Sequence, residues 1–120
     1  MNSSDAVSVL HVLEGEQLSS VTFVQDYIQL HFDGPCLTAY VWPNIFNQRI
    51  LVNPKSSAYR NELCDFIGGI VVKTTVEPEV RIAIHFANEK TLEISLKEID
   101  REGPETATFL EQAGKGLSVW

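Results

Sequence analysis

Two histidines occupy equivalent positions in a pattern that occurs twice in the chain. The first copy is the sequence IQLHF at residues 28–32, and the second is IAIHF at residues 82–86. A neutral imidazole can bind a metal ion or transfer a proton near neutral pH. Packing of the two copies about a pseudo-two-fold axis would bring His31 and His85 together in a polar pocket. One functional hypothesis is therefore a small enzyme or metal-binding domain with its pocket around these two residues.

Other residues give this hypothesis little chemical support. The sequence contains no H-x-H, H-x-x-x-H or HExxH pattern, and no GxSxG, GxxxxGK[ST] or GxGxxG pattern. Glu98, Asp100 and Glu102 lack the spacing of a calcium-binding loop, so we expect a solvated acidic loop there. We predict no catalytic, metal-binding or cofactor-binding residue and no cofactor, and we favour a protein that is not an enzyme.

The two copies differ in the residues that alternate with their apolar positions. Because successive side chains of a strand point to opposite faces, the residues between the apolar ones point outward. The outward positions of the second hairpin are charged or small and polar, whereas those of the first are rich in aromatic residues. Tyrosine and tryptophan are favoured at protein interfaces, because they bury a large area. Unless the chain itself covers them, we predict that a partner binds the outward residues of the first hairpin, which are Tyr27, Gln29, His31, Thr38, Tyr40 and Trp42.

The same alternation predicts the elements that hold these side chains. Strands are expected at 18–23, 27–32, 37–42, 49–52, 70–75, 80–86 and 91–99, and the apolar stripe at 57–67 predicts a helix. Residues 5–13 fit a short helix or a strand, and we favour the helix. Residues 104–120 fit a helix or a hairpin, and we favour the hairpin, because two glycines mark its turn.

These elements predict a β-rich α+β fold, with two antiparallel β-meander units and one helix packed on the sheet. The copies are offset by 54 residues, which fits either a duplication or a chance resemblance of two amphipathic hairpins. A chain of 120 residues is expected to form a single domain, 1–120. Its first unit would span residues 5–55, and residues 56–120 would hold the helix, the second unit and the C-terminal hairpin.

Composition and charge narrow the classes of partner. The net charge of −7 disfavours nucleic acid and anionic membranes, whose phosphates such a surface repels. Cys36 and Cys64 are far apart in the sequence, which is typical of reduced cysteines in a cytoplasmic protein. No signal sequence or membrane-spanning run is recognisable. We therefore expect a cytoplasmic protein.

The stretch 18–40, which contains the sequences VTF, DYI and LHF, resembles a family of small uncharacterised bacterial proteins. Members also carry an Ile-Gly pair after a helix, here at 67–68. A Gly-Pro-Glu sequence and a later aromatic residue follow, here at 103–105 and Phe109, and many members end on tryptophan, here Trp120. Some of these proteins lie near toxin–immunity systems, so the resemblance implies an immunity-like role. It implies no activity and no particular site residue.

The sequence as a whole predicts a non-enzymatic interaction domain of unknown process. It would act as a homodimer or bind another protein, and its acidic surface favours a basic partner through long-range attraction. The alternative is the enzyme or metal-binding domain with a pocket around His31 and His85.

Overall fold

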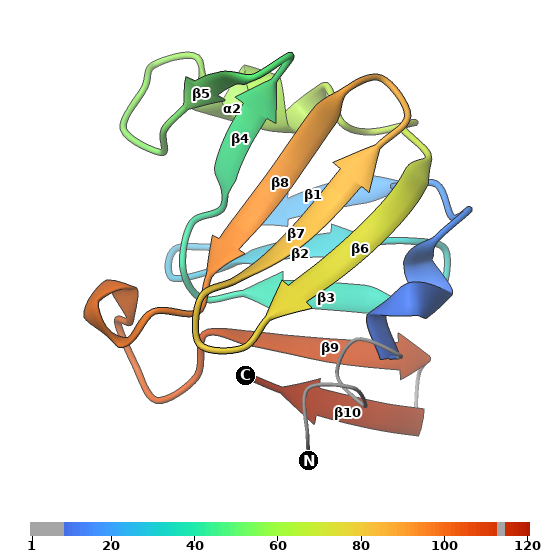
Figure 1. Ribbon diagram of the computed structural model, residues 1–120, viewed down its shortest axis with the longest axis vertical. Coiled ribbons are helices and arrows are strands. Elements are labelled where there is room, and N and C mark those ends of the chain that lie inside the picture. Colours follow the sequence, from blue (N-terminus) through green and yellow to red (C-terminus); the bar gives the residue numbers. More distant parts are fainter. Residues whose placement is uncertain (1–8, 113–114) are drawn as a thin grey trace.

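Two antiparallel sheets of five strands lie face to face in the protein (Figure 1). The structure is a computed structural model that describes residues 9–112 and 115–120. The first sheet has the strand order β1-β2-β3-β9-β10, and the second has the order β5-β4-β8-β7-β6. The strands of the first sheet are β1 (Ser20–Phe23), β2 (Ile28–His31), β3 (Cys36–Ala39), β9 (Ala107–Gln112) and β10 (Lys115–Val119). Those of the second are β4 (Asn44–Asn47), β5 (Ile50–Val52), β6 (Val71–Glu77), β7 (Arg81–Phe86) and β8 (Lys90–Ser95).

Each sheet combines a three-stranded meander with a hairpin from the other half of the chain. The hairpin β4–β5 follows the first meander in sequence, but β4 pairs with β8, where Ile45 lies opposite Leu92. The hairpin β9–β10 follows the second meander, but β9 pairs with β3, where Phe109 lies opposite Leu37. The two predicted antiparallel meanders are therefore present. The predicted boundary between residues 55 and 56 does not separate the sheets, because the chain has already crossed between them before β4. Duplication stays a prediction.

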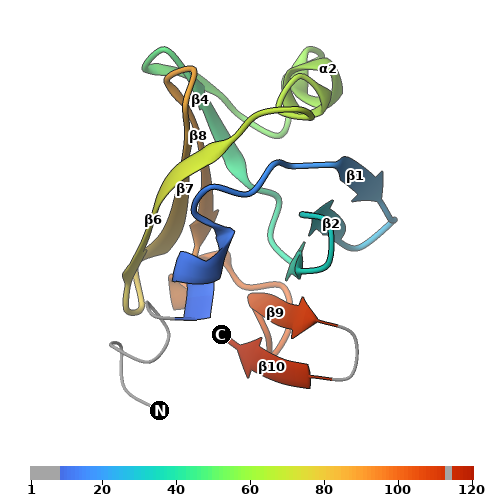
Figure 2. The same ribbon diagram turned by 90° about the vertical axis from the view of Figure 1, so that its right-hand side faces the viewer.

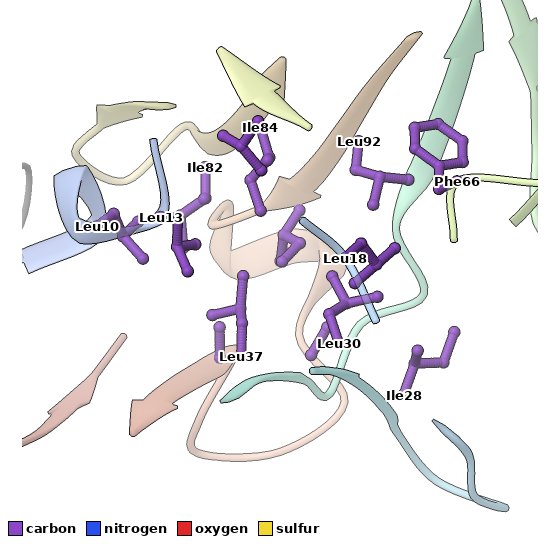
Figure 3. Packing of buried hydrophobic residues seen from close by; sticks show 14 of the residues in the cluster. Leu10, Leu13, Leu18, Ile28, Leu30, Leu37, Phe66, Ile82, Ile84 and Leu92 are labelled. Carbon is purple, nitrogen blue, oxygen red and sulfur yellow. The ribbon is translucent and has the colours of Figure 1, made fainter. Parts of the chain in front are cut away.

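A continuous apolar core fills the space between the sheets (Figure 3). The alternating residues of β2 and β3 that were expected to point inward, including Ile28, Leu30 and Leu37, are fully buried. They face Ile82, Ile84 and Leu92 of the second sheet, and each buried side chain of this size contributes roughly 1.5–3 kcal/mol. The sheet packing thus fixes which side chains point outward.

A short helix and the helical turn near the N-terminus lie at open sides of this sandwich (Figure 2). The helix α2 (Tyr59–Cys64) is shorter than the predicted helix at 57–67, and the chain then turns through Gly68, whose φ is +93°. Phe66 still packs edge-on against Phe86, with ring centroids 5.0 Å apart. The other helical segments are the 3₁₀ turns η1 (His11–Leu13) and η2 (Glu98–Asp100).

The sequence left two stretches ambiguous, residues 5–13 and 104–120, and the structure describes most of both. Residues 9–13 are helical, as favoured, whereas residues 5–8 lie outside the described part. The favoured C-terminal hairpin is confirmed as β9 and β10, although its turn at 113–114 lies outside the described residues.

Candidate functional site

The two histidines of the repeated pattern lie on opposite outer faces of the sandwich. His31 is on β2, and its Nε2 lies 3.3 Å from Oγ1 of Thr22. His85 is on β7, and its Nδ1 lies 3.2 Å from Oγ1 of Thr91. Because each follows a buried residue of its own strand, the core separates the two side chains. The arrangement does not form a shared pocket around His31 and His85. The described residues also contain no group of three histidine, cysteine or acidic side chains placed to hold a metal ion.

Five of the six predicted partner-binding residues share the outer face of the first sheet. The rings of Tyr27 and Tyr40 pack 5.7 Å apart. Between these rings and His31, Nε2 of Gln29 donates a hydrogen bond of 3.4 Å to Oγ1 of Thr38. Thr38 is only 7% exposed, whereas the other four are partly exposed. No described helix or strand covers the centre of this face.

Trp42 differs from the other predicted residues, and its expected outward position is wrong. Strand β3 ends at Ala39, so the alternation that defines its outer face does not extend to Trp42. The indole ring instead packs on Phe23, 6.4 Å away, and edge-on against Tyr59 of α2, 5.9 Å away. Trp42 is therefore partly buried, and it packs against the edge of the core while part of its side chain stays exposed.

A hollow of about 530 Å³ lies where Tyr40 and Trp42 meet two loops. The turn between β1 and β2 supplies one wall, and the loop between η2 and β9 supplies the other. A hydrogen bond of 2.9 Å from the backbone N–H of Tyr40 to the carbonyl of Thr106 fixes this second loop beside β3. We call this hollow the Tyr40–Trp42 groove; its lining residues are Gln25, Asp26, Tyr40, Trp42, Glu102, Gly103, Pro104 and Glu105.

The Tyr40–Trp42 groove combines aromatic rings with negative charge. Asp26, Glu102 and Glu105 are exposed, and within the described residues none of them forms an ion pair with a basic side chain. The rings of Tyr40 and Trp42 are partly exposed beside them. Carboxylates attract a cation, and the face of an aromatic ring attracts it further. The groove is therefore suited to positively charged groups.

A second hollow beside Trp42 carries positive charge. Trp42 also lines a hollow of about 590 Å³ with Lys55, Tyr59 and Arg60, and the guanidinium of Arg60 lies 6.0 Å from the centre of the Phe23 ring. The surface around Trp42 thus changes from acidic at the loop before β9 to basic at α2. A ligand that extends past Trp42 would meet charges of both signs.

A third hollow, of about 580 Å³, lies on the outer face of the second sheet beside His85. Its lining includes Phe46 and Arg49 together with the acidic residues Glu89 and Glu93. Glu93 is already 3.6 Å from Arg81, so its charge is partly compensated. The lining contains both positive and negative side chains, so its charge does not indicate a class of ligand.

The sequence identified only part of the Tyr40–Trp42 groove. The aromatic side chains of Tyr40 and Trp42 led to the prediction that both residues bind a partner. For Trp42, the predicted outward orientation is wrong. Asp26 lies between the predicted strands 18–23 and 27–32, and Glu102 lies in the predicted solvated acidic loop. The β2–β3 hairpin places Asp26 beside Tyr40. The placement of Glu102 depends on the pairing of β9 with β3, which joins distant parts of the chain and leaves no local signal.

No family model matches the chain, and no curated protein or solved structure matches it either. The resemblance to immunity-type bacterial proteins consequently stays a prediction. None of the described helices is long and apolar enough to cross a membrane. Cys36 and Cys64 are both free thiols.

Proposed function

We propose that this protein is a non-enzymatic interaction domain and that the Tyr40–Trp42 groove binds a basic segment of a protein partner. The supporting observation is that one hollow brings together two partly exposed aromatic rings and three exposed carboxylates. Its open shape suits the arginine or lysine side chains of an extended segment better than an enclosed small molecule.

Two electrostatic contributions favour the binding of such a partner. Each arginine or lysine that enters the groove gains charge-assisted hydrogen bonds with Asp26, Glu102 or Glu105, and it can stack on Tyr40 or Trp42. The net charge of −7 adds a long-range attraction that speeds the encounter at low salt. An immunity-like role, with a basic toxin as the partner, is the form of this function to which the sequence resemblance points. We place this function in the cytoplasm.

Binding of a fluorescein-labelled nona-arginine peptide, followed by fluorescence anisotropy, tests the groove. The triple variant Asp26→Asn, Glu102→Gln, Glu105→Gln removes its three charges. A matched triple, Asp65→Asn, Glu79→Gln, Glu89→Gln, removes three exposed charges elsewhere. We expect the groove variant to weaken binding at least tenfold and the matched variant less than threefold, because only the former loses direct contacts.

A nona-citrulline peptide of the same length is the neutral control and is expected not to bind. Equal weakening by the two triple variants would show that only the overall charge attracts the peptide. Equal binding of the citrulline peptide would show that charge is not recognised. Either result would refute the proposed groove.

A further inference from the structure

Strand β10 forms one outer edge of the first sheet (Figure 1). An edge strand leaves backbone N–H and C=O groups without a neighbour and can pair with another chain. Within residues 9–112 and 115–120, β9 is the only strand that pairs with β10. β10 has five residues, whereas the edge strands β1 and β5 have four and three.

The edge strand β6 of the second sheet differs from β10, because residues 14–16 of the same chain cover part of it. The N–H of Gly15 donates to the carbonyl of Val71 at 2.7 Å, and the N–H of Val71 donates to the carbonyl of Glu16 at 2.9 Å. Farther along, the N–H of Thr74 donates to the carboxylate of Glu14 at 3.0 Å. The described residues provide β10 with no comparable cover.

Hydrogen-bond alternation shows which groups of β10 face the open edge. The N–H of Trp120 donates to the carbonyl of Ala107 at 2.9 Å, so these two residues form a bonded pair. In an antiparallel ladder bonded and non-bonded pairs alternate, so Ser118 bonds to Phe109, and its neighbours Leu117 and Val119 do not bond to β9. The N–H and C=O groups of Leu117 and Val119 therefore point away from β9.

The same edge carries exposed apolar side chains. Leu117 is 65% exposed and Val119 is 44% exposed, and both lie on the outer face of the sheet. Leu117 lies opposite the partly buried Leu110 of β9, which extends this apolar strip inward. Unpaired backbone groups and apolar side chains thus coincide on one strand, which is the combination that edge-to-edge association buries.

We propose that two copies of the chain associate through β10, which pairs antiparallel with β10 of the second copy about a two-fold axis at Leu117. In this register, the backbone N–H and C=O groups at the open edge of one β10 face those of the other. Leu117 pairs with Leu117 of the second copy, and Lys115 pairs with Val119 in both directions. Leu117 and Val119 have their donor and acceptor at the edge, so the central Leu117 pair exchanges both hydrogen bonds.

A two-fold axis also limits the assembly to two copies. The same strand is used by both copies, so the dimer leaves no further β10 edge on which a third copy could add. The two first sheets become one continuous sheet of twice the width, and the two Leu117 side chains lie side by side on its outer face. The dimer does not depend on the basic partner proposed for the Tyr40–Trp42 groove.

Sedimentation equilibrium of the full chain at 5–200 μM tests the association. We expect twice the chain mass of 13.4 kDa for the unmodified protein. Leu117→Lys places two like charges against each other at the axis, so it should give a monomer that still unfolds cooperatively, because Leu117 is exposed in the single chain. Its melting temperature should no longer depend on protein concentration, whereas that of the unmodified dimer should. Leu51→Lys alters a side chain of comparable exposure, 52%, on the other sheet and should remain a dimer. A monomeric unmodified protein, or a dimeric Leu117→Lys, would overturn the proposal.

Cysteine cross-linking tests the register, in a background with Cys64→Ser. Leu117→Cys places two thiols at directly opposite positions, whose Cα atoms in a bonded pair lie about 5.5 Å apart, within disulfide range. Mild oxidation should therefore yield a covalent dimer. Val119→Cys is also exposed, but in this register its counterpart lies four residues along the strand, beyond disulfide reach, so it should stay monomeric on a denaturing gel. Cross-linking of Val119→Cys in place of Leu117→Cys would contradict the register.

Discussion

At the scale of single residues, Tyr59 connects the helix to the crossing between the sheets. Its hydroxyl donates a hydrogen bond of 2.6 Å to the carbonyl of Pro43, and its ring supports Trp42. Both Tyr59 and Pro43 are buried. Desolvation by burial raises the pKa of Tyr59 above its ordinary value of 10.0. The residue therefore affects both the stability of the fold and its dependence on pH.

We expect Tyr59→Phe to lower the free energy of unfolding by about 1–3 kcal/mol, because the buried Pro43 carbonyl loses its donor. The pH dependence gives a second measurement. The folded pKa lies above the unfolded one, so the stability contribution is complete below pH 10 and is lost as the pH rises further. Urea unfolding from pH 8 to 11.5 should show a steeper alkaline decline for the unmodified protein than for Tyr59→Phe. Parallel declines would contradict this assignment.

Trp42 shows the limit of residue-level reasoning. The aromatic character of positions 40 and 42 correctly drew attention to this part of the surface. The rule of alternation then placed Trp42 on the outer face, but the strand ends before it. Strand ends depend on long-range pairing, here on where β9 stops matching β3, and this information is not local.

At the scale of elements, the turn between β4 and β5 has an unfavourable sequence. Gln48 and Arg49 have φ values of +51° and +72°, and they connect the paired residues Asn47 and Ile50. Two left-handed central residues define a type I′ turn, for which Asn-Gly is the preferred sequence. The Cβ atom of most residues costs about 1–2 kcal/mol in this conformation, whereas glycine and asparagine adopt it more readily.

The double substitution Gln48→Asn, Arg49→Gly should therefore raise the free energy of unfolding by about 1–2 kcal/mol, as measured by urea denaturation. Lys55→Gly is the control, because Lys55 lies in an exposed turn without a positive φ. There the added backbone freedom should slightly destabilise the protein. A loss of stability in both variants would show that the turn is not strained.

Several elements were predictable because their signals are local. The hairpins β2–β3 and β7–β8 follow from alternation and turn residues, and the C-terminal hairpin follows from its β-formers and glycines. Strand β4 was missed, because Pro43 and Asn44 read as the end of a strand and asparagine flanks the short apolar pair at 45–46. Its pairing with β8 overrides this weak local preference.

At the scale of the whole molecule, the two sheets depend on each other through their exchanged hairpins. A division of the chain at residue 55 would separate β3 from β9 and also β4 from β8. Each half would then hold one complete meander and one hairpin, but neither sheet would be complete. Sequence patterns within each half indicate the strands, but they contain no information on which sheet receives a hairpin.

Separate fragments 1–55 and 56–120 should therefore be largely unfolded by far-ultraviolet circular dichroism. Mixed in equal amounts, they should regain sheet structure, because each supplies the hairpin that the other lacks. A cooperative thermal transition in either fragment alone would show that the exchanged hairpins are not required for folding.

The exchange of hairpins also sets an order of events during synthesis. The chain leaves the ribosome from its N-terminus, so β3 emerges long before β9, its neighbour on one side. At roughly 5–20 residues per second, the interval between the end of β3 and the start of β9 is about 3–14 s. For that time one side of β3 has no native partner, and a translational pause between the two strands would prolong its exposure in the nascent chain.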